Sequence, residues 1–130
     1  MAFDPQTPQG VVAALSDLDY GIAGSERLAY TTAFLNATAS GNTQLVAASA
    51  GRRIRVIWIV VTNKDASVVA FKLQSATTDI TSTHDLAADG GGYAMNAHPA
   101  FYCQTAVGEA LNANLGGVSS VGVDIGYVLV

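Results

Sequence analysis

The sequence predicts an all-β domain, a sandwich or a barrel, from three observations. Short runs of residues alternate between apolar and polar, with the two-residue period of a half-buried strand. Clusters of Gly, Asn, Asp and Ser separate these runs roughly every 8 to 12 residues, a spacing typical of sandwiches and barrels. No helical pattern alternates with the strands, and no solenoid or propeller repeat appears.

The composition indicates one domain that does not leave all of its surface in water. The 130 residues suffice for a sizeable core, and half of them are apolar. Only 12% are charged, about half of the ~25% that is usual for soluble domains. We interpret this as a subunit packed into something larger, with a compact monomer of neutral surface as the alternative.

The charge and the apolar runs exclude several classes of partner. A net charge of −4 with six basic residues does not suit nucleic acid, which is bound through many lysines and arginines. The cluster of Arg52, Arg53 and Arg55 is read as a solvated strand start, or else as a docking site for an acidic partner. The run 57–61 is far shorter than the ~20 residues of a membrane span, and no signal peptide is visible. Cys103 is the only cysteine, which excludes an internal disulfide and indicates synthesis in a reducing cytoplasm.

Residues 1–25 are predicted to be an arm, and residues 26–130 the β domain. The first 25 residues hold two of the three prolines and no sustained alternation. We expect an extended arm that lies on its own domain or on a neighbouring subunit, with a disordered tail as the alternative. Phe3, Tyr20 and Ile22 are the side chains expected to anchor it.

The strongest strand signal is Gly51–Asn63. Ile54, Val56, Trp58 and Val60 are expected on one face, opposite the arginines. From Ile57 onward both faces are apolar, which indicates a strand that runs into the core centre or into a subunit contact. The candidate interface residues on this strand are Ile57, Ile59 and Val61.

The other strands follow from the same alternation. A first strand, 26–36, places Leu28, Tyr30, Thr32 and Phe34 on one face. The polar loop 62–65 predicts that 67–75 forms an antiparallel hairpin with the Gly51–Asn63 strand. About eight strands are expected in all; the rest are 43–49, an edge strand or loop at 79–85, and strands around 93–95, 101–105, 111–115 and 121–129.

No catalytic, metal or cofactor residues are assigned, and no enzyme activity is expected. Ser82, His84 and Asp85 are close in sequence, but triads are assembled in space from separate elements, so this proximity carries no weight. His84 and His98 lack the ligand spacing of a metal site. Cys103 is read as a buried core residue, because no nearby basic residue lowers its pKa.

Two aromatic residues have two readings each. Trp58 lies between Val56 and Val60, and Tyr127 lies between Ile125 and Leu129. Such positions on regular apolar faces favour core packing, with a platform for stacking sugars as the alternative.

Six segments carry a resemblance to a known family. They are GNTQLVAA (41–48), AGRRIRV (50–56), VAFKLQS (69–75), LAADGG (86–91), TAVGEALNANL (105–115) and VGVDIGY (121–127). Together they resemble a domain of tailed-bacteriophage virion proteins, which includes capsid cement or decoration proteins and some fibre or tail modules. The resemblance covers about residues 40–130, and His98-Pro99 replaces an Asn-Pro pair of that pattern.

The resemblance implies a jelly-roll-like antiparallel β-sandwich and a virion location. The leading hypothesis is a non-enzymatic cement or decoration subunit on the outer surface of a phage head, made in the host cytoplasm. Its expected partners are the major capsid protein and further copies of itself in a homotrimer. The alternative is a receptor- or carbohydrate-binding module of a head or tail fibre.

Overall fold

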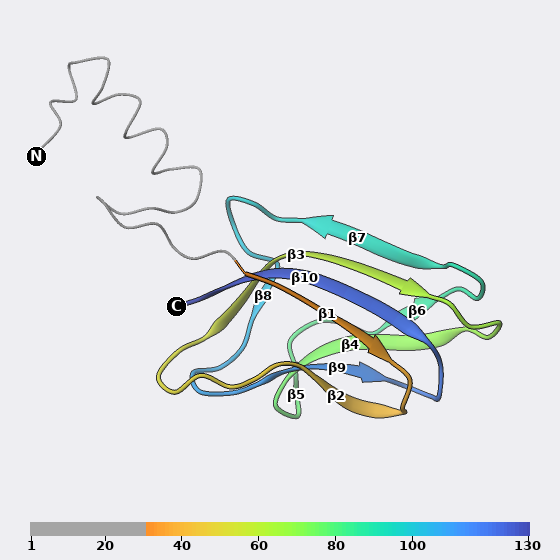
Figure 1. Cartoon of the computed structure of the whole chain (residues 1–130), viewed down its shortest axis with the longest axis horizontal. Coiled ribbons are helices and arrows are strands. Elements are labelled where there is room, and N and C mark those ends of the chain that lie inside the picture. The colour runs from red at the N-terminus through yellow and green to blue at the C-terminus, as the bar shows by residue number, and fades with distance from the viewer. Residues whose placement is uncertain (1–30) are drawn as a thin grey trace, which may run out of the picture.

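The computed structural model describes residues 31–130, which form two antiparallel β-sheets packed face to face as a sandwich (Figure 1). The predicted arm, with Phe3, Tyr20 and Ile22, and residues 26–30 lie outside the described residues. The strands are β1 (Thr31–Ala37), β2 (Gly41–Val46), β3 (Ile54–Asn63), β4 (Val69–Ser75), β5 (Thr78–Asp79), β6 (His84–Leu86), β7 (Gly92–Asn96), β8 (Cys103–Gln104), β9 (Leu111–Leu115) and β10 (Val121–Leu129).

The strand order is that of a jelly roll. One sheet has the order β1-β10-β3-β7, with β8 also paired to β3. The other has the order β2-β9-β4-β5, with β6 also paired to β4. The first four strands alternate between the two sheets, which is how a jelly roll winds its chain. The all-β antiparallel sandwich predicted from the sequence is therefore confirmed.

The predicted hairpin between Gly51–Asn63 and residues 67–75 is wrong. β3 and β4 lie in different sheets, and β3 pairs with β10, β7 and β8 instead. The connection between them crosses the end of the sandwich. Asn63 holds this crossing, because its fully buried side chain donates to the carbonyl oxygens of Ser67 and Leu86 and accepts from Ser119.

The core lies between the two sheets and takes one face of each strand. In β9 the buried residues Leu111, Ala113 and Leu115 alternate with half-buried asparagines. β10 buries Val121, Val123 and Ile125 in the same way, as predicted. The largest fully buried side chains are Phe71, Ile54, Ile59, Leu73, Leu111, Leu115 and Ile125.

A bulge in β3 reverses which of its residues face the core. Val56 pairs with Tyr127 and Trp58 pairs with Gly126, so Ile57 is an extra residue with no partner on β10. Ile54 and Val56 point inward before the bulge, and Ile59, Val61 and Asn63 point inward after it. The prediction that Trp58 packs in the core beside Val56 is therefore wrong, because Trp58 shares the outer face with Val60.

The turns agree with their sequence signals. Asp89 and Gly90, which begin an Asp-Gly-Gly-Gly cluster, both have positive φ, at 57° and 104°. Gly92 begins β7 so close to β3 that a Cβ atom there would collide with the backbone carbonyl of Val61. Among residues 31–130, no helix is long and apolar enough to cross a membrane.

Candidate interaction surface

The outer face of the β1-β10-β3-β7 sheet is the most distinctive surface of the described domain. We call it the apolar face and define it by Phe34, Trp58, Val60, Ala94 and Asp124. Phe34, Asp124, Val60 and Ala94 are paired in sequence across the four strands and so form one row across the sheet. The ring of Phe34 is 80% exposed and Val60 is 41% exposed. Large apolar side chains therefore stand in solvent on this face.

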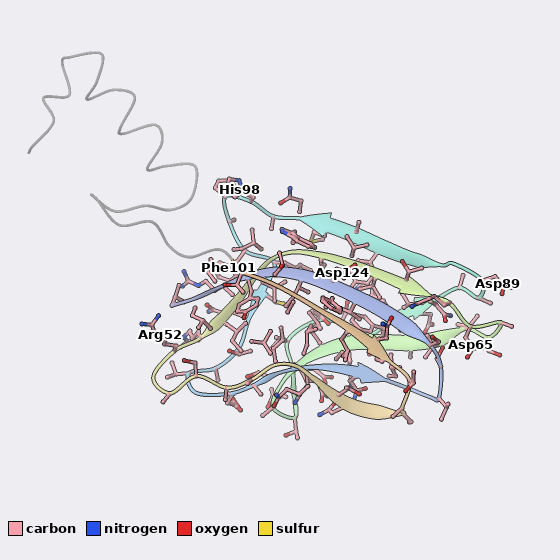
Figure 2. The ribbon with its side chains drawn as sticks, in the orientation of Figure 1. Arg52, Asp65, Asp89, His98, Phe101 and Asp124 are labelled. Atoms are coloured by element: carbon pink, nitrogen blue, oxygen red, sulfur yellow. The ribbon has the colours of Figure 1, made fainter. Side chains whose placement is uncertain are left out.

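β10 supplies almost no side-chain bulk to the middle of this face. Its outward positions are Gly122, Asp124 and Gly126, and Gly126 lies opposite Trp58. Asp124 is consequently the single carboxylate between two glycines, beside Phe34 and Val60; Figure 2 shows it over β10. The face is thus a shallow apolar surface with one negative charge near its centre.

Two open depressions mark the apolar face. One, of about 350 Å³, lies over β1, β10 and the second half of β3. Its lining includes Phe34, Val60, Asp124 and Lys64, whose Nζ donates to Asn36 Oδ1 at 2.7 Å. The other, of about 500 Å³, lies between β3 and β7 and is lined by Trp58, Val60, Met95 and Asn96, among others. The first hollow mixes apolar side chains with the polar Asn36, Thr62, Lys64 and Asp124, whereas the second is lined mainly by apolar side chains, with Asn96 among them.

Arg55 lies at one edge of the apolar face, near the first residue of β1. Its Nε donates to Gln104 Oε1 at 3.0 Å, and its guanidinium lies 4.7 Å from the centre of the Phe101 ring. This cation–π contact and hydrogen bond hold the side chain in place. Arg53 donates to the Thr105 carbonyl oxygen at 3.5 Å. Arg52 is exposed at the same end of the sandwich (Figure 2). The described protein thus orders two of the three clustered arginines itself.

The outer face of the other sheet has the opposite character. It consists of amides and charges that bond to one another: Asn114 Nδ2 donates to Asn42 Oδ1 at 2.6 Å, and Gln74 Nε2 donates to Asp79 Oδ1 at 2.6 Å. Lys72 and Asp79 form an ion pair at 3.0 Å. The hydrogen bond from Gln74 and then that from Lys72 hold the pKa of the Asp79 carboxyl below its usual value. These amides and charges of the polar face therefore have partners within the subunit.

The residues considered for chemistry do not assemble into a catalytic group in the described structure. Ser82 Oγ is 3.5 Å from His84 Nε2, and the His84 ring packs against that of Tyr93 at 4.7 Å between centres. Asp85 is the next residue of β6, so its side chain projects to the other face of the strand. Within residues 31–130 no three His, Cys, Asp or Glu side chains are grouped to hold a metal ion. Cys103 is buried, and burial raises the pKa of its thiol to about 12, which makes it unreactive.

Two of the three candidate interface residues of β3 lie in the core of the subunit. Ile59 and Val61 are buried in the core of the subunit itself, and Ile57 is half-buried at the bulge. Tyr127 packs against the core cluster, as its first reading predicted. The outward residues of β3 are instead Trp58, Val60 and Thr62.

Sequence reasoning missed the apolar face because it placed Trp58 inside the sandwich. A signal was present in the last strand, where Gly122, Asp124 and Gly126 occupy alternate positions. Glycine and aspartate at successive outward positions show that this face lacks bulk at its centre. They do not show which side chains of β3 lie beside them, since that depends on the bulge.

Comparison with known proteins did not identify a relative. No protein-family model matches the chain, and no curated protein matches it either. What is shown is therefore the two-sheet antiparallel sandwich, and the virion family remains an inference from the sequence motifs.

Proposed function

We propose that this protein is a non-enzymatic virion structural protein, a cement or decoration subunit that binds the outside of a phage head. Its partners are the major capsid protein and two further copies in a homotrimer. The motifs support this proposal, since the six segments that resemble virion proteins fall on β2, the start of β3, β4, the Asp89–Gly90 turn, β9 and β10. The segments that carry the resemblance therefore coincide with strands and one turn of the sandwich.

The observation that carries the proposal is the difference between the two outer faces. Amides and charges of the polar face bond to one another, whereas the apolar face exposes Phe34 and Val60, with the half-buried Trp58 and one carboxylate beside them. Exposed apolar patches of this kind mark sites of protein contact.

The size of the apolar face supports an oligomer rather than a single subunit. Four strands about 4.8 Å apart and five residues long cover about 300 Å², whose burial is worth about 6 to 10 kcal/mol if all of it is apolar. Association costs about 4 to 15 kcal/mol, so one such face would bind weakly. Three linked subunits would bind together with much higher avidity. They would bind the assembled shell and stabilise it by mass action.

Binding to purified phage shells tests the proposed function. The full-length protein is incubated with shells that lack it, and co-sedimentation is measured for the native chain, Val60→Asp and Gln44→Asp. The first substitution places a charge on the apolar face, and the second places one on the exposed polar face. The proposal predicts that Val60→Asp reduces binding at least tenfold and that Gln44→Asp does not. Equal binding by all three, or binding to tails and not to heads, would contradict it.

A carbohydrate-binding module is a second candidate, because Trp58 is on the outer face. The indole lines the 500 Å³ depression together with Asn96, an amide that could donate to a sugar hydroxyl. A glycan array distinguishes this function from cement. Saturable binding that Trp58→Ala abolishes and that Tyr127→Phe preserves would favour the carbohydrate-binding module, and an array with no signal would remove it.

A further inference from the structure

We propose that the acidic N-terminal segment, residues 1–30, docks on the arginine end of its own subunit. The arginine end is the surface formed by Arg52, Arg53, Arg55, Phe101 and Val107; Figure 2 shows Arg52 and Phe101 toward the same end of the sandwich. The inference goes beyond the proposed function and does not depend on it, because it uses neither the shell nor the apolar face. Three observations carry it: arginines without acidic partners, the composition of the segment, and the place where the segment joins β1.

The arginine end carries positive charge that the described part of the protein leaves unpaired. Three of the six basic residues of the chain lie here. Within residues 31–130 none of these arginines forms an ion pair, whereas Lys72 does so with Asp79. Glu109 lies on a nearby loop, but its carboxylate accepts a hydrogen bond from Ser75 Oγ at 3.2 Å. Positive charges gathered without an acid beside them favour an acidic partner.

The arginine end also presents apolar side chains. The Phe101 ring is 39% exposed and lies 4.7 Å from the guanidinium of Arg55. Val107 is 52% exposed, and the next residue, Gly108, donates its N–H to the Arg52 carbonyl oxygen at 2.8 Å, so Val107 lies beside Arg52. Exposed ion pairs contribute little by themselves. This surface therefore fits a partner that combines carboxylates with apolar side chains.

Residues 1–30 have this composition. Four of the ten acidic residues of the chain and one of its six basic residues fall in the segment, a formal charge of −3: Asp4, Asp17, Asp19 and Glu26 against Arg27. The run DLDYGI, residues 17–22, places its two aspartates among Leu18, Tyr20 and Ile22. Both the charge and the apolar side chains of the segment therefore complement the arginine end.

The segment joins the sandwich beside the arginine end of its own subunit. Thr31, the first described residue, pairs with Tyr127, and Tyr127 pairs with Val56. Thr31 therefore lies two strand spacings, about 10 Å, from Val56, which follows Arg55 in the chain. Asp19 is twelve residues before Thr31 and can reach up to about 40 Å from it. Because tethering gives an effective concentration in the millimolar range, the segment meets its own arginine end before that of another copy.

Limited proteolysis of the full-length protein tests the docking. Chymotrypsin cleaves after Tyr20 when the segment is released, so the cleavage rate measures the released population. The readout is the ratio of the rate in about 1 M salt to the rate in about 0.01 M salt, since charges are screened over about 3 Å in the first and about 30 Å in the second. A ratio taken within one protein cancels its intrinsic susceptibility. We expect at least a tenfold ratio for the native chain and a ratio close to unity for Arg52→Glu with Arg55→Glu.

Two further variants separate docking from a general effect of charge or folding. Lys64→Glu with Lys72→Glu changes the net charge by the same amount away from the arginine end, and it should keep the native ratio. Arg52→Glu alone alters an exposed side chain without removing the contact between Arg55 and Phe101. It should lower the ratio at least threefold while circular dichroism stays native. A native ratio in Arg52→Glu, or the same loss in the lysine variant, would overturn the proposal.

Charge reversal on both partners shows whether the segment docks within one chain. Asp17→Arg with Asp19→Arg should abolish the salt dependence, and adding these changes to the Arg52→Glu, Arg55→Glu chain should restore at least a fivefold ratio. A refolded mixture of the acid-reversed and the arginine-reversed proteins should stay close to unity, because neither chain can pair with itself. No restoration in the fourfold variant, or protection in the mixture, would overturn the proposal, the latter by assigning the segment to a second copy. The assay contains no shells, so its outcome is independent of the shell-binding test.

Discussion

Trp58 lies directly opposite Gly126 in the ladder between β3 and β10, so the only indole of the protein has a residue without a side chain as its neighbour. The bulge at Ile57 brings about this pairing, since it turns Trp58 outward while Ile59 and Val61 stay in the core. The outer face of the sheet consequently has apolar walls and a low centre. The proposed function depends on this surface.

Neighbouring residues of β3 should respond in opposite ways to a charge. Ile59→Asp buries a carboxylate at a fully buried position, so we expect a loss of more than 4 kcal/mol and no stable fold. Val60 is exposed, so Val60→Asp should change the free energy of unfolding by less than about 1 kcal/mol. Urea unfolding followed by circular dichroism measures both. An unfolded Val60→Asp protein would show that the bulge is misplaced.

Asn63 should be among the most sensitive polar positions in the described domain. Its buried side chain donates to the carbonyl oxygens of Ser67, Leu86 and Ala87 and accepts from Asp65 N and Ser119 Oγ. Asn63→Ala leaves these groups without partners, and we expect a cost of about 2 to 4 kcal/mol. Asn114→Ala, which removes a half-buried amide whose hydrogen bond to Asn42 is exposed on the polar face, is the matched control. Its expected cost is below about 1 kcal/mol. Equal costs would contradict the role given to Asn63.

Two glycine substitutions should differ in how much they destabilise the protein. A Cβ atom at Gly92 collides with the Val61 carbonyl, so Gly92→Ala must push β7 away from β3. We expect it to cost about 1 to 3 kcal/mol, as overpacking usually does. Gly117 has open space around its Cβ position, and Gly117→Ala should stay within about 0.5 kcal/mol of the native protein. Thermal unfolding of both variants checks the pairing of β3 and β7.

The buried thiol of Cys103 should make the free energy of unfolding fall at alkaline pH. Burial raises the pKa of Cys103 from 9.0 to about 12, so the folded state holds its proton more tightly than the unfolded state. Its contribution to stability is therefore complete below pH 9 and is lost as the pH rises from 9 to 12, at up to about 1.4 kcal/mol per pH unit. Other groups titrate equally in Cys103→Ala, so the difference between the two proteins isolates the thiol. Parallel curves for the two proteins would show that Cys103 is exposed to water.

The fold class was predictable because each strand carries its own pattern. Leu111, Ala113 and Leu115 in β9, and Val121, Val123 and Ile125 in β10, alternate with polar or small residues, and burial follows that alternation. The pairing of the strands was harder to predict from the sequence. A short polar loop after β3 suggests a hairpin, whereas burial of the Asn63 side chain makes the chain cross between sheets there. That burial depends on contacts distant in sequence.

The candidate site was less predictable than the fold for a related reason. In β3 every residue from Val56 to Val61 is apolar, so the pattern does not reveal where an extra residue shifts the register. The bulge is visible only through the partner strand, where Gly126 and Tyr127 pair with Trp58 and Val56. Similarly, Phe34 was identifiable as a strand residue, but its outward direction follows from the burial of Ala37 on the other side of β1.

The most direct test of the central claim is a cryo-electron microscopy reconstruction of virions that contain this protein. The account predicts density for the sandwich on the outside of the head, in groups of three. The face of Phe34, Trp58 and Val60 should be covered by protein, and the amide-rich face of β2, β9 and β4 should be open to solvent. Density at the tail alone, none on the head, or a solvent-exposed apolar face would contradict it.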